Sequence, residues 1–388
     1  MGDFPAVRRA RFAVAFVFFM NGIVMGTWAA HIPLVEERLA MSHSTLGIAL
    51  LTMALGALLA MPLTGPMIAR FGSALVTRVA TAVLLLAFLL PILAPAPVLL
   101  MLALFVFGAS NGIMDVAMNA HGVAVGRRLG RPVMSSFHGM WSLGGLAGSG
   151  LAALLLPIMP PLAQAGCTVV VASAFGVAAL IFLLPAHADG GGQRMALAWP
   201  NRATLGLGAL CFLGLTSEGA IMDWAALHLK GSLQLGPGLA ATGFATYSAS
   251  MALSRFSGDW LRSRVGAREL VRWSGLLAAG GLVVALVVPV PLLAIAGFAL
   301  VGLGLANLIP VLFDAAGRIP GQSAGTGIAA VATIGYSGFI VGPPIIGFVA
   351  DATSLAVALG LIVLACLAIA LSATVVVPSA PGATATRV

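Results

Sequence analysis

Four acidic residues lie inside or near long apolar segments, where a carboxylate is costly. They are Asp115, Glu218, Asp223 and Asp314. A charge at the centre of a bilayer costs at least about 2.5–3.5 kcal/mol on insertion scales, so such residues usually face a water-filled cavity or a polar partner. Carboxyl groups in that setting can bind and release protons, contact a solute, or make polar contacts between helices.

Asp115 is the clearest case, because residues 98–126 contain no other aspartate, glutamate, lysine or arginine. Asn111, Asp115 and Asn119 are four residues apart, so on a helix they form one stripe. Burial favours the neutral carboxylic acid, which suits a proton carrier. The alternative is a polar helix-packing contact.

His138 follows the short loop at 127–131. Counting about 1.5 Å per residue back from that loop places Asn119 and His138 at similar depth. We hypothesise an Asn119–His138 contact that poises Asp115 for proton coupling. The simpler alternative for His138 is an ordinary interhelical hydrogen bond.

Glu218 and Asp223 are five residues apart, a helical rotation of about 140°, so they cannot face the same point. Glu218 lies nearer the middle of its apolar segment and is our second candidate for proton coupling. Asp223 adjoins Trp224 and is either an outer-gate residue or a solvated helix end. Asp314 and Arg318 are four apart, as in an ordinary ion pair.

Several amide and aromatic side chains share the apolar segments with these acids, and they could line a solute site. The candidates are Asn21, Trp28, Asn111, Asn119, Trp141, Asn307 and Tyr336. Aromatic rings stack on sugars or on apolar solutes, although Trp and Tyr also anchor helices at the membrane interface.

The composition requires membrane helices to hold these residues. Of 388 residues, 60% are hydrophobic and only 8% are charged, against roughly a quarter charged in soluble domains. Apolar runs longer than the roughly 20 residues needed to cross a bilayer recur along the chain. We predict an all-α membrane protein with twelve spans, at 11–31, 45–69, 75–94, 97–125, 133–157, 163–185, 203–228, 238–257, 270–290, 291–313, 325–349 and 353–377.

The arginines predict the orientation. With both termini inside, nearly all of them, Arg255 included, fall on the cytoplasmic side, and only Arg38 and Lys230 fall outside. The polarity of segment 186–202 predicts a cytoplasmic linker between two six-helix bundles, 1–185 and 203–388. We expect a multi-pass protein of the bacterial inner membrane.

The two halves repeat each other weakly. The pairs of similar stretches are Gly22 to Trp28 with Gly219 to Trp224, Gly108 to Asn111 with Gly304 to Asn307, Gly144 and Gly148 with Gly338 and Gly342, and Gly65 to Gly72 with Gly258 to Gly266. Two parallel six-helix repeats are one known transporter plan. Chance similarity of glycine-rich helices is the alternative.

At these residues the chain resembles the major facilitator superfamily over essentially all twelve predicted helices. The resemblance implies a loop that latches the cytoplasmic side shut, with Gly65, Arg70 and Gly72 in one copy and Asp259, Arg264 and Gly266 in the other. Ala69 stands where the first copy should have an acid, so Asp259 alone would carry the latch charge.

Within that superfamily the chain is similar to the fucose-permease-related group and its YbjJ-like branch. The similar stretches are Asp115-Val-Ala-Met-Asn119, Ser136-Phe-His138, Ser142-Leu-Gly-Gly and Asp223-Trp224-Ala. Fucose permease has a glutamate matching Asp115, an asparagine matching Asn119 and another acid in its first helix. The first helix here offers only Asn21 and His31, so fucose is not the expected solute.

No GxxxxGK[ST], HExxH or CxxC pattern occurs, so we expect neither an enzyme nor a bound cofactor or metal. We predict a monomeric secondary transporter in the lipid bilayer that works by alternating access. It would be coupled to protons and would carry a sugar-like or small polar metabolite. The alternatives are a gradient-driven exporter of drugs or apolar metabolites, suggested by the many Met and Phe residues, and a membrane-embedded enzyme or sensor. Nothing suggests a nucleic-acid partner.

Overall fold

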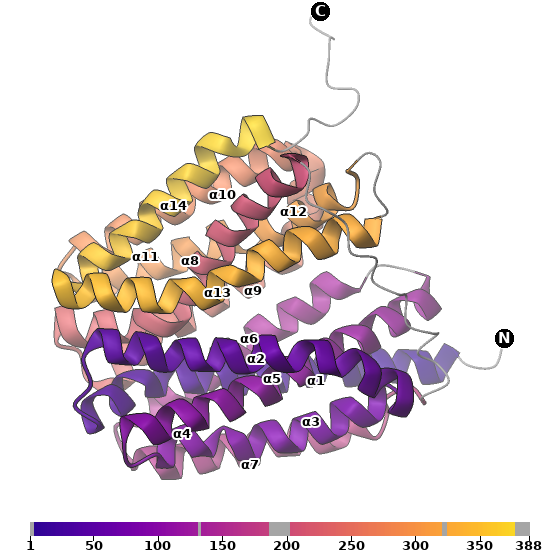
Figure 1. Ribbon diagram of the computed structural model, residues 1–388, viewed down its shortest axis with the longest axis horizontal. Coiled ribbons are helices and arrows are strands. Elements are labelled where there is room, and N and C mark those ends of the chain that lie inside the picture. The colour runs from indigo at the N-terminus through magenta and orange to yellow at the C-terminus, as the bar shows by residue number, and fades with distance from the viewer. Residues whose placement is uncertain (1–3, 131–132, 186–201, 320–323, 377–388) are drawn as a thin grey trace, which may run out of the picture.

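The computed structural model describes residues 4–130, 133–185, 202–319 and 324–376. In these ranges the chain forms helices without strands, and their ribbons lie in two stacked bundles, one from each half (Figure 1). The first bundle contains α1 (Phe4–Arg38), α2 (His43–Phe71), α3 (Ser73–Ala87), α4 (Leu89–Leu93), α5 (Pro97–Leu129), α6 (Met134–Leu155) and α7 (Pro161–Leu180). The second contains α8 (Arg202–Leu233), α9 (Pro237–Val265), α10 (Ala267–Val287), α11 (Pro291–Leu305), α12 (Leu308–Ala316), α13 (Ala324–Ala352) and α14 (Leu355–Val376).

These helices make the twelve spans of the predicted fold, because two spans are each broken into two helices. The third predicted span divides at Phe88 into α3 and α4, and the tenth divides at Ala306 and Asn307 into α11 and α12. Within the described ranges, nine segments are long and apolar enough to cross a membrane. Of the predicted linker 186–202, residues 186–201 lie outside the described ranges, so the domain boundary stays a prediction.

The break in the tenth span follows from Pro310. Proline has no backbone N–H, so residue 310 cannot donate to the carbonyl of Ala306, its helical partner four residues back. The helix is interrupted at Ala306 and Asn307 and resumes at Leu308. Pro343 and Pro344, by contrast, lie inside the uninterrupted α13.

Glycines allow the helices within each bundle to approach closely. A Cβ at Gly144 would lie 2.0 Å from the carbonyl oxygen of Phe19, and one at Gly148 would lie 2.0 Å from that of Ile23, so α6 packs directly on α1. In the second bundle, a Cβ at Gly338 would lie 2.7 Å from the Phe212 oxygen, where α13 packs on α8. The glycines that were predicted to match between the two halves therefore lie at helix contacts in both.

The turns after α2 and α9 repeat the same backbone geometry. Gly72 has φ 80° and ψ 151°, and Gly266 has φ 81° and ψ 161°. Residues with a Cβ rarely adopt positive φ, so glycine is required at both turns. The same turn geometry therefore recurs at matching places in the two halves.

The bundles meet through α2 against α13 and α6 against α9. We call the side with the α1–α2, α8–α9 and α13–α14 connections the far side, because both chain ends lie opposite it. The ribbons of the two bundles lie closest there and spread apart toward the side of the termini (Figure 1).

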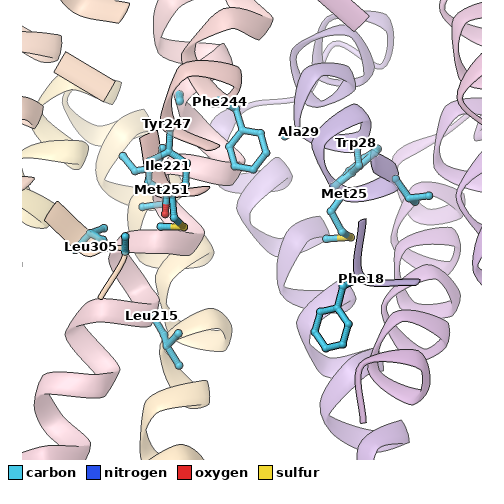
Figure 2. Packing of buried hydrophobic residues seen from close by; sticks show 14 of the residues in the cluster. Phe18, Met25, Trp28, Ala29, Leu215, Ile221, Phe244, Tyr247, Met251 and Leu305 are labelled. Atoms are coloured by element: carbon cyan, nitrogen blue, oxygen red, sulfur yellow. The ribbon is translucent and has the colours of Figure 1, made fainter. Parts of the chain in front are cut away.

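Apolar cores flank the boundary between the bundles. Figure 2 shows Phe18, Met25 and Trp28 of α1 on one side, and Tyr247 and Met251 of α9 on the other. The outward-facing surface is also apolar, with exposed leucines such as those at 63, 154 and 371. Lipid can cover such a surface, whereas water would not stabilise it.

The α1–α6 contact predicts a difference between two glycines of α6. In Gly148→Ala the new methyl meets the Ile23 carbonyl, and overpacking of this kind typically costs about 1–3 kcal/mol. We expect a clear drop in the melting temperature of the purified protein in detergent. Gly150→Ala is the control, because nothing lies within 4 Å of a Cβ at that position; equal melting temperatures of the two variants would contradict the packing.

Candidate functional site

A hydrogen-bonded cluster joins three helices of the first bundle at Asn21. The indole N–H of Trp141 on α6 donates to Asn21 Oδ1 at 2.8 Å, and Asn21 Nδ2 on α1 donates to Asn111 Oδ1 on α5, also at 2.8 Å. Because an indole nitrogen can only donate, Trp141 fixes which end of the Asn21 amide faces it. Three predicted site residues therefore meet at one point.

Asp115 lies one turn along α5 from Asn111, and its partner belongs to the same helix. Asn119 Nδ2 donates to the Asp115 carbonyl oxygen at 2.8 Å and to its Oδ1 at 3.1 Å. The predicted Asn119–His138 contact is wrong, because spacing by four lets the Asn119 amide bond within its own helix. His138 instead has an exposed side chain on α6, and its ring meets Phe18 edge-on at 5.3 Å.

The second bundle contributes an ion pair, Arg255 of α9 with Glu218 of α8. The Arg255 Nη2 to Glu218 Oε2 distance is 3.5 Å, and only 10% and 13% of the two side chains are exposed. Arg255 Nη1 also donates to Ser142 Oγ on α6 at 2.8 Å. One guanidinium therefore touches both bundles.

The interrupted tenth span supplies another acceptor for Arg255. Its Nε donates to the Ala306 carbonyl at 3.4 Å, the carbonyl that Pro310 leaves without a helical N–H. The proline thus turns a backbone oxygen into a contact of the site.

Arg255 was predicted to be one of the cytoplasmic arginines and not a site residue. The structure places it inside α9, ten residues before the helix ends at Val265. The missed signal was its position within the predicted span 238–257, since an arginine inside a span needs a partner.

Acids from both halves converge on the same region between the bundles. Tyr336 on α13, with 38% of its surface exposed, lies within electrostatic reach of both Asp115 and Glu218. Tyr247 on α9 lies within reach of Glu218 and Arg255. Among the described residues, Tyr247 Oη and Glu218 Oε1 have no hydrogen-bond partner. The region therefore combines charged groups with unused polar atoms.

Two predicted solute-binding residues are occupied elsewhere. Trp28 is fully buried in the apolar core, where its ring meets Phe107 edge-on at 6.1 Å. Asn307 donates to Ser254 Oγ at 3.0 Å and to its carbonyl at 3.2 Å, which ties α9 to the break in the tenth span. Their burial and contacts fit structural roles.

The predicted latch residues lie at the helix ends or turns on the side of the termini. Arg70 stacks over Phe71 at 5.2 Å, and Arg264 over Trp260 at 5.6 Å. Gly65 lies in α2 with no atom within 4 Å of a would-be Cβ, and Gly72 and Gly266 form the positive-φ turns. The side chain of Asp259 lies outside what the structure describes, so the latch stays a prediction.

The far side holds polar contacts between the bundles that no sequence pattern predicted. Asp351 at the end of α13 accepts hydrogen bonds from the backbone N–H groups of His43 (3.0 Å) and Ser44 (2.9 Å) and from the Ser44 hydroxyl. A carboxylate at a helix N-terminus satisfies free donors and the helix dipole. Glu37 of α1 pairs with Lys230 of α8.

The remaining acids lie apart from the site between the bundles. Asp223 is buried beside Trp224, whose ring meets His43 edge-on at 5.9 Å, so it lies near the far side. Asp314 pairs with Arg318 at 3.0 Å, which confirms the predicted ion pair. One stretch of α5, Gly108-Ala-Ser110-Asn-Gly112, matches the Gly-x-Ser-x-Gly pattern of hydrolases, but Ser110 lies within the helix and donates to the Phe107 carbonyl. It therefore lacks the strand-to-helix turn of a hydrolase nucleophile.

The family model for the Major Facilitator Superfamily matches residues 12–343. The chain belongs to the major facilitator superfamily. It is 37% identical over 366 residues to an uncharacterized MFS-type transporter of Yersinia pestis, covering 92% of this chain and 94% of that protein. It is 36% identical over 351 residues to the membrane protein MosC of Rhizobium meliloti, covering 89% and 85%.

Solved structures of this superfamily share the fold. The nucleoside transporter NupG superposes with a TM-score of 0.71 at 12% identity, covering 95% of this chain and 98% of that one. FucP in its outward conformation gives a TM-score of 0.64 at 14% identity, covering 95% and 99%. The chain is therefore a secondary transporter of small solutes and not an enzyme.

The buried ion pair predicts an asymmetry between its two members. A carboxyl group left alone can take up a proton, but an arginine cannot lose one. We therefore expect Glu218→Gln to lower the melting temperature more than Arg255→Gln, with costs on the order of 1–3 kcal/mol.

The double variant Glu218→Gln with Arg255→Gln is the control for this pair. It should cost less than the sum of the single variants, because neither buried group is left without its partner. Strict additivity in thermal denaturation would show that the two side chains do not interact.

Proposed function

We propose that this transporter moves a small polar solute together with protons, through a site between the two bundles. The observation that carries the proposal is the Arg255 guanidinium, which contacts Glu218 of the second repeat and Ser142 of the first. A site shared by both repeats can be exposed to one side and then the other as the bundles rock.

Asp115 is proposed as the proton-coupling carboxyl group of the first repeat. Its side-chain partner is the Asn119 amide, so the carboxyl group can gain or lose a proton without breaking an ion pair. Glu218 is proposed as the corresponding group of the second repeat, and its protonation would release Arg255. His138, exposed beside Arg255, completes the proposed set.

The polar lining favours a polar solute over the drugs or apolar metabolites of the alternative. Asn111 and Trp141 are partly exposed and present polar groups at the edge of the Asn21 cluster, which a polar solute can bond and an apolar one cannot. Tyr336 offers an exposed ring for stacking.

The conformation fits one state of an alternating-access cycle. The Asp351 and Glu37 contacts join the bundles on the far side, while the bundles spread on the side of the termini (Figure 1). We propose a monomer in the bacterial inner membrane with both termini cytoplasmic, which the clustering of arginines near that side supports. The far side is then external and closed.

Asp115→Asn should separate coupling from solute passage. We expect the variant to fold and to exchange solute, but to lose proton-driven accumulation, because the amide cannot carry a proton. The measurement is solute-dependent proton flux into proteoliposomes loaded with a pH-sensitive dye, over a panel of small polar solutes.

Asp314→Asn makes the same chemical change at a surface ion pair and should leave this flux intact. Full proton-driven accumulation by Asp115→Asn would remove Asp115 as the coupling group.

Asp351→Ala should loosen the far side, because the N-terminus of α2 loses its carboxylate acceptor. In a background without native cysteines, we expect Tyr336→Cys to react several-fold faster with an impermeant maleimide added from that side. Thr353→Ala is the control, since the Thr353 hydroxyl bonds only the Val349 carbonyl of its own helix. Unchanged labelling in Asp351→Ala would rule out this contact as part of the gate.

A further inference from the structure

Arg255 is more than a partner for Glu218. Removing a guanidinium from water costs free energy. Arg255 is held by Glu218 on α8, by Ser142 on α6 and by the Ala306 carbonyl between α11 and α12. Ser142 in turn donates to the His138 carbonyl at 3.2 Å. The guanidinium is therefore fixed at the boundary between the bundles.

The pairing of Arg255 with Glu218 is incomplete. Their single contact is 3.5 Å long, whereas charge-assisted N–H···O bonds are typically about 2.7–2.9 Å. Among the described residues, Glu218 Oε1 has no donor, and the bonds of Arg255 leave one Nη2 hydrogen unused. The pair is loose enough for another anion to displace the carboxylate.

Guanidinium geometry selects the kind of anion. The planar fork of arginine presents parallel N–H groups that match the two oxygens of a carboxylate. An uncharged polyol offers single hydroxyl groups, which compete poorly with the carboxylate already present. In Arg255, Nε and Nη1 are already bonded to the Ala306 carbonyl and to Ser142, so Nη2 is the nitrogen open to a solute. Its positive charge favours a carboxylate oxygen over a neutral hydroxyl group.

Charge balance supports the same solute class. The ionisable groups within electrostatic reach of Glu218 or Arg255 are His138, Cys211, Tyr247 and Tyr336, and beyond them Asp115 lies within reach of Tyr336 and Cys366 within reach of Tyr247. Arg255 is the only permanent cation among them. A carboxylate adds one negative charge, and one proton on Glu218 removes one, so the loaded site keeps its net charge while it crosses the membrane.

We propose that Arg255 is the specificity-determining residue of the transporter and binds the carboxylate of an acidic, hydroxylated small solute. This inference rests on the proposed function. The incoming carboxylate replaces Glu218 on the guanidinium, and the released Glu218 accepts one proton from a hydronium ion on the open side. One O–H bond of hydronium breaks, leaving water, and one carboxylic O–H bond forms. The reverse steps release anion and proton together on the other side.

The test uses matched solutes that differ in one carboxylate. Gluconate is compared with sorbitol, and lactate with propane-1,2-diol, by thermal shift of the purified protein in detergent. We expect gluconate or lactate to stabilise the wild type and the uncharged member of each pair to have no effect. Apparent affinity should rise as pH falls, by up to about tenfold per pH unit, because one proton is taken up per anion.

Two variants separate this role from general effects on folding. Arg255→Lys keeps the positive charge but loses the guanidinium N–H groups that position it, and it should weaken carboxylate binding at least tenfold. Glu218→Gln removes the competing carboxylate, so binding should tighten at neutral pH and lose its pH dependence. If Arg255→Lys does not fold, the Glu218→Gln result decides alone.

Three outcomes would overturn the inference: no stabilisation by either carboxylate, equal stabilisation by the uncharged members, or weaker anion binding by Glu218→Gln. Proton flux in proteoliposomes distinguishes it from the proposed function. Proton flux driven by sorbitol would support proton coupling and refute carboxylate selection. Carboxylate binding that depends on Arg255 but drives no proton flux would support carboxylate selection and refute proton coupling.

Discussion

The cost of holding a guanidinium away from water governs the centre of this molecule. Arg255 can remain there only because groups from several helices supply acceptors. Those acceptors come from both halves of the chain, so the hydrogen bonds available to Arg255 depend on the relative position of the bundles. A bundle movement that changes one must change the other, and this is how a local charge can influence a global transition.

The two repeats use the shared plan differently. In the first repeat, Asn21 at the centre of α1 makes neutral hydrogen bonds to Asn111 and Trp141. In the second, the region of α8 that corresponds to it carries Glu218, paired with Arg255. The first bundle therefore combines neutral amides with the carboxyl group of Asp115, whereas the second carries an ion pair.

Much of this could be predicted from the sequence, and the limits have physical causes. Apolar run lengths gave the twelve spans, and the Asn111–Asp115–Asn119 spacing gave one helix face, because both depend on local periodicity. Depth counting could not find the Asn119 partner, since side-chain direction decides whether an amide bonds its own helix. Arg255 was predicted on the cytoplasmic side because the orientation rule counts charged residues and does not consider which side chains point into the protein. The Asp351 contact with α2 joins residues about three hundred positions apart, which no local pattern encodes.

The turns at Gly72 and Gly266 have the same positive-φ backbone although the residues around them differ in charge. The first copy has no acid between Gly65 and Gly72, whereas the second has Asp259. A lost charge can be compensated by a neighbour, whereas a chain reversal this tight has no substitute that carries a side chain. A side chain placed at either turn would therefore strain the junction between two helices, whether or not an acid lies nearby.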